Sequence, residues 1–168
     1  MDEQIKRRVF FSFHYDADVW RASQIRNMGV VDNSSTFSDN DWEEVKKKSN
    51  LAIKRWINSQ MSRRSCLVVL IGEETYSRYW VNYEIQKAYE LGKGIVGIYV
   101  HNLKDEYGNQ SEEGFNPFDF IETEDGEPLS SYVVAFRSRY SRSNNVYRDI
   151  ADNLPDLIED AIENASFY

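Results

Sequence analysis

The chain has 168 residues, of which 41% are hydrophobic and 14% aromatic, and this is enough apolar material for residues 1–168 to form one domain with a single core. The formal net charge is −8, and residues 101–168 carry 15 acidic but only 5 basic side chains, which argues against a protein that grips nucleic-acid phosphates. Because the sequence has no signal-peptide pattern and no apolar run long enough for a membrane helix, we expect a cytoplasmic protein.

The N-terminal part predicts a strand, a helix and a short second strand. The run VFFSF at 9–13 is apolar and aromatic, as expected of a buried strand. Residues 18–29 have the spacing of a helix, and Gly29 suits the position just after its C-terminus. The segment VVD at 30–32 then predicts a second, very short strand.

A polar loop, NSSTFSDND at 33–41, precedes the next helix. Ser38 or Asp39 can cap this helix, and its apolar face continues as far as Ile57. The basic run at 46–48 falls on the polar face of the same helix, so we interpret it as solvated surface.

The middle of the chain predicts two buried strands joined by a helix. SCLVVLIG at 65–72 and GIVGIYV at 94–100 are unbroken apolar runs, typical of parallel strands covered on both faces. The helix between them contains Glu84 and ends before Gly92. This alternation indicates right-handed βαβ units.

The C-terminal third predicts a long excursion, a last strand and a last helix. Residues 101–130 are polar and look like an insertion, SYVVAF at 131–136 suggests a fifth strand, and 144–165 predict a helical region interrupted near Pro155. We therefore predict an α/β fold of the flavodoxin-like, doubly wound class, with a mainly parallel five-stranded sheet and helices on both faces.

Ligands of such sheets bind at the carboxyl ends of the strands. Residues 12–16, 33–41 and 71–80 are therefore the candidate rim segments. No dinucleotide-binding glycine motif, phosphate-binding loop or serine nucleophile elbow occurs in these or any other segments, which removes the commonest nucleotide-binding and hydrolase chemistries. A receiver domain needs an aspartate at the end of its third strand and a lysine after its fifth strand. Neither residue is present at the corresponding place here.

Metal binding has little support in the sequence. His14 and His101 are the only histidines, and the lone Cys66 lies inside a predicted strand, so we expect no metal site, no disulfide and no cofactor. Asp16 and Asp18 could hold a divalent ion, although acids in the first turn of a helix are the more ordinary interpretation.

Glu84 is the candidate functional carboxylate, because it lies on the side of an amphipathic helix that carries Trp80 and Ala88. The structural alternative is a half-exposed acid paired with Lys87 or Lys93. The end of the first strand supplies further side chains that are suited to binding a flat heterocycle that carries a ribose. Together with Trp80, the predicted substrate-binding residues are Ser12, Phe13, His14 and Tyr15.

Several segments make this chain similar to a known family. RVFFSFHYD at 8–16 and the W-x-x-x-E spacing of Trp80 and Glu84 resemble TIR domains. Together with the segments at 41–58 and 69–85 and with NPFDF at 116–120, they most closely resemble the TIR-like proteins of the prokaryotic Thoeris anti-phage defence system. The resemblance covers most of residues 7–150. Two departures are Val81, where TIR domains commonly have cysteine, and Ala17, which separates two acids after the first strand.

The resemblance implies an enzyme that consumes NAD as a substrate, with Glu84 as the essential acid. It also implies a cyclic ADP-ribose-type second messenger that activates an effector protein, and self-association through the loop at 33–41. Two alternatives remain open at this point. One is a catalytically silent TIR-like interaction module, and the other is a glycosyl transferase in which Glu84 is a covalent nucleophile.

Overall fold

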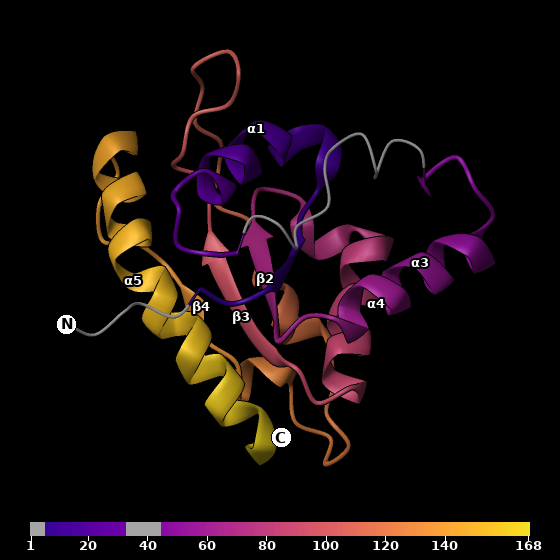
Figure 1. Cartoon of the computed structure of the whole chain (residues 1–168). Coiled ribbons are helices and arrows are strands. Elements are labelled where there is room, and N and C mark those ends of the chain that lie inside the picture. The colour runs from indigo at the N-terminus through magenta and orange to yellow at the C-terminus, as the bar shows by residue number, and fades with distance from the viewer. Residues whose placement is uncertain (1–5, 33–44) are drawn as a thin grey trace.

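The computed structural model describes residues 6–32 and 45–168, which build a sheet flanked by helices (Figure 1). The sheet has four strands in the order β1-β2-β3-β4, and every pairing is parallel. The strands are β1 (Val9–Ser12), β2 (Cys66–Ile71), β3 (Gly94–Tyr99) and β4 (Ala135–Phe136).

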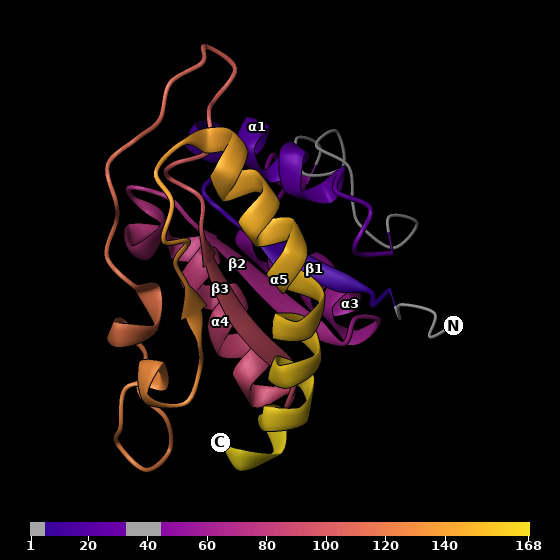
Figure 2. The ribbon, with the colours of Figure 1, turned by 90° about the vertical axis from the view of Figure 1, so that its left-hand side faces the viewer.

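Helices cover both faces of this sheet, as the sequence predicts (Figures 1 and 2). One face packs against α1 and α5, and the opposite face against α3 and α4. None of the helices in the described part of the chain combines the length and apolar character needed to cross a bilayer. The helices are α1 (Tyr15–Arg26), α3 (Asn50–Ser62), α4 (Tyr79–Glu90) and α5 (Ser143–Asn164), with short 3-10 turns η2 (Thr75–Ser77), η3 (Pro117–Phe120), η4 (Leu129–Ser131) and η5 (Ala165–Phe167).

The central strand β2 explains why two cores form. All six of its residues are buried, and successive side chains point to opposite faces of the sheet. Leu67 and Val69 therefore pack with α3 and α4, whereas Cys66 and Val68 pack with α1 and α5. Burial also raises the pKa of the Cys66 thiol, so this cysteine is a small buried apolar residue without thiolate chemistry.

The predicted second strand does not form. Residues 30–32 make one backbone hydrogen bond to the start of β1, from Asp32 N to Arg7 O at 3.0 Å, but no ladder. Gly29, with φ of +79°, turns the chain shortly after α1, and residues 30–32 pass the end of β1 without pairing along it. Among the described residues the sheet thus has four strands instead of five, and its strand order follows the chain without a reversal.

The starts of two helices differ from the prediction. Helix α1 begins at Tyr15, three residues early, and α3 begins at Asn50, where Ser49 Oγ accepts a hydrogen bond from Ala52 N at 3.2 Å. The basic run at 46–48 therefore lies in a turn before α3, while the predicted caps Ser38 and Asp39 lie outside the described residues.

Helix α5 is continuous, contrary to the interruption predicted near Pro155. Ile150, Leu154 and Ile158 are all buried against the sheet, on both sides of the proline. A proline inside a helix removes one backbone hydrogen bond, and the buried apolar face on either side keeps the helix in place despite this loss.

The excursion at 101–130 runs along the side of the molecule next to β4 (Figure 2). Phe118 is fully buried in the core that α3 and α4 share. Gly114 approaches the backbone of Gly72 and Glu73 so closely that a Cβ there would clash with their carbonyl oxygens. The segment therefore packs closely against the loop after β2.

Candidate active site

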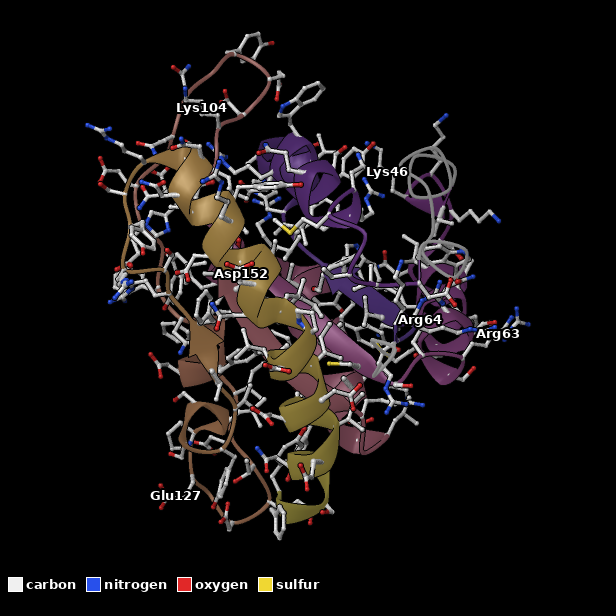
Figure 3. The ribbon with its side chains drawn as sticks, turned by 60° about the vertical axis from the view of Figure 1, so that its left-hand side comes forward. Lys46, Arg63, Arg64, Lys104, Glu127 and Asp152 are labelled. Carbon is white, nitrogen blue, oxygen red and sulfur yellow. The ribbon has the colours of Figure 1, made fainter. Side chains whose placement is uncertain are left out.

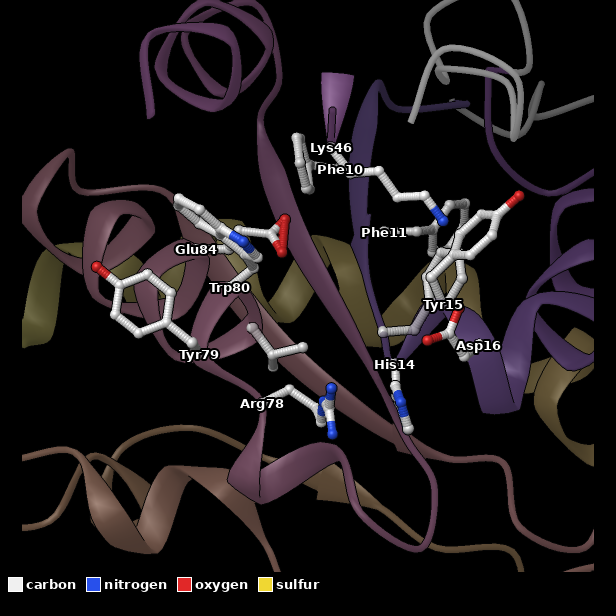
Figure 4. Close-up of a pocket in the computed structure, with 12 residues that line it drawn as sticks. Phe10, Phe11, His14, Tyr15, Asp16, Lys46, Arg78, Tyr79, Trp80 and Glu84 are labelled. Carbon is white, nitrogen blue, oxygen red and sulfur yellow. The ribbon is translucent and has the colours of Figure 1, made fainter. Parts of the chain in front are cut away.

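A cavity of about 250 Å³ opens at the carboxyl end of β1, between that strand and the start of α4 (Figure 4). The connection after β1 leads to α1 on one face of the sheet, whereas η2 and α4 after β2 go to the other face. A crevice remains where two such connections separate, which is the usual place for a ligand in a parallel sheet. The cavity is smaller than the ~300–1,000 Å³ typical of ligand pockets, so it has room for only part of a larger ligand.

Five of the six predicted site residues line this cavity, and the sixth, Ser12, contacts one of them. No residue of the excursion at 101–130 lines it, so this segment lies beside the cavity and not over it. The predicted residues in the lining are Phe13, His14, Tyr15, Trp80 and Glu84.

Ser12 and Glu84 meet because the strand and the helix that carry them direct both side chains into the space between β1 and α4. Ser12 is two residues after Phe10 in β1 and so points to the same face, toward α4. Glu84 is three residues after Val81 and one before Ile85, both of which α4 buries in the core. Ser12 Oγ donates a hydrogen bond to Glu84 Oε1 at 3.2 Å, across 72 positions of sequence.

Glu84 is almost completely withdrawn from water, with 7% of its surface exposed. This burial raises the pKa of the Glu84 carboxyl well above its ordinary value, and the hydrogen bond from Ser12 offsets only part of the rise. The alternative of a half-exposed ion pair is wrong, because Lys87 Nζ lies 3.6 Å from Glu90 Oε2 and Lys93 Nζ contacts Ser62 O.

The burial of Glu84 predicts a gain in stability when the carboxyl is removed. In Glu84→Gln the free energy of unfolding at pH 8 should rise by ~0.5–2 kcal/mol. Because the folded-state pKa is raised, the wild type loses stability as pH rises from the unfolded-state pKa, about 4.3, through the folded-state value. Urea unfolding of both proteins at several pH values measures the difference in their free energies of unfolding. The two proteins should converge near pH 4, and a constant difference at every pH would contradict the prediction.

Aromatic side chains line both walls of the cavity (Figure 4). On the β1 side, Phe13 and Tyr15 are stacked with their ring centroids 6.1 Å apart. On the α4 side, the Trp80 ring makes edge contacts with the rings of Tyr79 and Tyr83, with centroid distances of 4.9 Å and 5.7 Å. Trp80 is therefore both a packing residue and part of the wall in front of Glu84. Such walls offer faces to a flat ring and reduce the access of water.

His14 does not cap α1 with its side chain, although it occupies the N-cap position. Its Nδ1 atom is buried and has no hydrogen-bond partner within the described part of the chain. A buried nitrogen without a partner is uncommon in folded proteins and is often explained by a ligand or water. The His14 side chain is therefore not used to cap α1, and its role at the cavity stays a prediction.

The structure adds charged residues that the sequence did not assign to the site. Lys46 reaches the cavity from the turn before α3, with Nζ 5.3 Å from the ring centre of Tyr15. Arg78 lines it from the residue before α4, and Asp16 lies on the wall opposite Glu84 (Figure 4). Arg78 could have been noticed from its place two residues before Trp80. Nothing in the local pattern marked Lys46, because its position depends on the fold.

The acids after β1 are not arranged as a metal site. Asp18 is buried and accepts a hydrogen bond from Arg21 Nη1 at 2.7 Å, and Asp16 lies apart at the cavity. Among residues 6–32 and 45–168 no group of three or more potential protein ligands could hold a metal ion. The cavity thus offers one buried carboxyl, a hydroxyl, aromatic faces and two cationic side chains, a set suited to a nucleotide.

Comparisons with known proteins show the family of this chain. Residues 10–105 match the sequence model of the family described as "Thoeris protein ThsB, TIR-like domain". The chain is also 42% identical, over 134 residues, to a Bacillus cereus (strain MSX-D12) protein named "Putative cyclic ADP-D-ribose synthase ThsB1". The match covers 75% of this chain and 70% of that relative. The chain therefore belongs to the TIR-like ThsB family of Thoeris proteins.

Proposed function

We propose that this protein breaks the bond between nicotinamide and ribose in NAD, with Glu84 as the essential acid, and joins the remaining parts into a cyclic ADP-ribose-type product. The observation that carries the proposal is the buried Glu84, held by Ser12 within an aromatic-walled cavity at the strand ends. The name of the relative supports the same reaction class. In this proposal NAD is a substrate, and no cofactor or metal takes part.

The chemistry needs only one buried carboxylate. Ordinary glycosidases use two carboxyl groups, because a sugar leaving group must be protonated. In NAD the nicotinamide is already a cationic pyridinium, so the electron pair of the breaking bond returns to the ring nitrogen and neutral nicotinamide departs. The ribose is left as an oxocarbenium-like cation. The Glu84 carboxylate can then stabilise this positive charge and hold the ribose hydroxyls.

The raised pKa of Glu84 fits this role. In the free protein the cavity favours the neutral carboxyl because burial penalises the charge. A bound pyridinium brings an opposite charge into the same space and favours the carboxylate. An interaction between opposite charges is stronger where water is excluded, and it increases further as the cation concentrates on the ribose.

Cyclisation requires that an atom of the same substrate, and not water, captures the cation. The aromatic walls formed by Phe13, Tyr15 and Trp80 limit the access of water to the ribose. A nucleophile from the adenosine half then forms the new bond to the anomeric carbon and gives up one proton to the solvent. Capture by water would instead yield linear ADP-ribose.

The test is to incubate the purified protein with NAD and resolve the products by liquid chromatography with mass detection. Nicotinamide and a product with the mass of cyclic ADP-ribose are expected, with neither formed by Glu84→Gln. Linear ADP-ribose alone would restrict the protein to NAD hydrolysis. A covalent ribosyl adduct on Glu84 would instead support a transferase that uses this residue as a nucleophile.

We further propose that the cyclic product activates an effector protein. A second candidate function is that of a catalytically silent, self-associating TIR-like module. The observation in its favour is an aromatic cluster with two exposed rings, in which the half-buried Tyr76 contacts Phe115 at 5.0 Å and Phe120 at 5.7 Å between ring centroids. Absence of any NAD turnover, together with self-association that Glu84→Gln preserves, would favour this function.

A further inference from the structure

Arg78 is a cationic side chain at the cavity that has no partner among the residues that the structure describes. It is exposed, it lies between η2 and α4, and its side chain lines the cavity (Figure 4). Its guanidinium makes no hydrogen bond or ion pair with any residue of 6–32 or 45–168, and its side chain does not cap α4. An arginine at a cavity, free to form two parallel hydrogen bonds, suits a phosphate or carboxylate of a ligand.

The charges around the cavity differ from those of the whole chain. The protein carries a net charge of −8, whereas the cavity lining holds two bases, Arg78 and Lys46, beside two acids, Asp16 and Glu84, and so has no excess of negative charge. His14 lies toward the same end as Arg78 in Figure 4, and its imidazole provides a further possible donor. The carboxyl of Glu84 is placed away from Arg78 and His14, against Ser12 and behind Trp80 (Figure 4). One end of the cavity is therefore suited to an anion and the other to a cation.

The spacing along α4 fits the two ends of one nucleotide. Arg78 is the N-cap residue just before α4 and Glu84 is the sixth residue of that helix, so their backbones lie about 7–9 Å apart along the helix axis, and both side chains line the same cavity. This separation is comparable to the reach from the anomeric carbon of a ribose, through its 5′ carbon, to the phosphates beyond. A ribose held at Glu84 would thus place its 5′-diphosphate beside Arg78.

We propose that Arg78 binds the diphosphate of the dinucleotide substrate, with His14 as an additional donor, and so fixes the nicotinamide ribose against Glu84. This inference rests on the proposed function for the identity of the substrate. Arg78 is a binding residue in this account and takes no part in breaking the bond. It makes the site selective for nucleotides that carry a diphosphate over nucleosides that lack one.

Binding measurements in the Glu84→Gln background test the inference without turnover. NAD and nicotinamide riboside, which shares the reacting bond but has no phosphate, are titrated by calorimetry into Glu84→Gln with and without Arg78→Ala. Loss of a charged hydrogen-bonding group should weaken NAD binding by ~10- to 100-fold. Riboside binding should change less than about twofold, and Arg78→Lys should restore part of the NAD affinity.

Arg63→Ala is the matched control. Arg63 is exposed just after α3, and Figure 3 shows its side chain projecting outward at the edge of the molecule. In the Glu84→Gln background this control should leave both affinities unchanged. The inference would be overturned if Arg78→Ala lost affinity for NAD and for the riboside equally, or if its NAD affinity were unchanged. It would also be overturned if Glu84→Gln bound no measurable NAD. Arg78-dependent NAD binding without turnover in the wild type would uphold it while the proposed function fails.

Discussion

Glu84→Gln should lower the rate of nicotinamide release from NAD by at least ~10²–10³-fold, the loss expected when a group that stabilises charge in a transition state is removed. Glutamine has almost the same shape and can keep a hydrogen bond to Ser12, so the cavity and the binding of NAD should remain. What disappears is the negative charge that opposes the oxocarbenium-like cation. Initial rates of nicotinamide release by the two proteins measure the effect directly.

The pH profile separates this role from a merely structural one. Because burial raises the pKa of the Glu84 carboxyl, wild-type kcat/KM should rise with pH through that raised pKa and fall as the carboxyl becomes protonated. Glu84→Gln should show no such rise in its residual rate. Ser12→Ala removes the hydrogen bond that favours the carboxylate, so its profile should move to higher pH. A Glu84→Gln variant with near wild-type turnover would refute the catalytic role.

Arg21→Ala should destabilise the folded protein by ~3–5 kcal/mol, as expected when one partner of a buried ion pair is removed. Only 4% of the Arg21 side chain and 1% of the Asp18 side chain are exposed. Burial already raises the pKa of the Asp18 carboxyl despite the neighbouring guanidinium, and Arg21 also donates to Leu103 O at 2.8 Å and to Asn109 O at 2.9 Å. Its loss therefore leaves an acid and two carbonyls without their donor.

Urea unfolding at pH 7 measures the loss, and Arg63→Ala provides the exposed control, which should change stability by less than about 0.5 kcal/mol. A double variant, Asp18→Ala with Arg21→Met, removes both charges and should recover a large part of the stability. Equal stability losses for Arg21→Ala and the control would show that the pair is not important for folding. Cleavage by a protease within 101–116 should increase in Arg21→Ala, because Arg21 holds this segment through two carbonyls.

The sequence determined the features that depend on local pattern. Unbroken apolar runs indicated the positions of β2 and β3, because a strand covered on both faces needs no polar residue, and an aromatic run indicated β1. The spacing of Trp80 and Glu84 on an amphipathic helix located α4 and its unusual acid. Where local pattern and tertiary packing compete, the prediction failed. The run at 30–32 forms no strand, and α5 continues through Pro155 because its buried face outweighs one lost hydrogen bond.

Only the tertiary structure decided how the candidate site is assembled. The contact of Ser12 with Glu84 joins residues 72 positions apart, and the burial that raises the Glu84 pKa comes from packing between β1 and α4. Lys46 looked like solvated surface and Arg78 had no assigned role, yet both line the cavity. Residue type and local spacing show which chemical groups the chain contains. Their distances, burial and charge interactions depend on segments that the fold brings together from far apart in the chain.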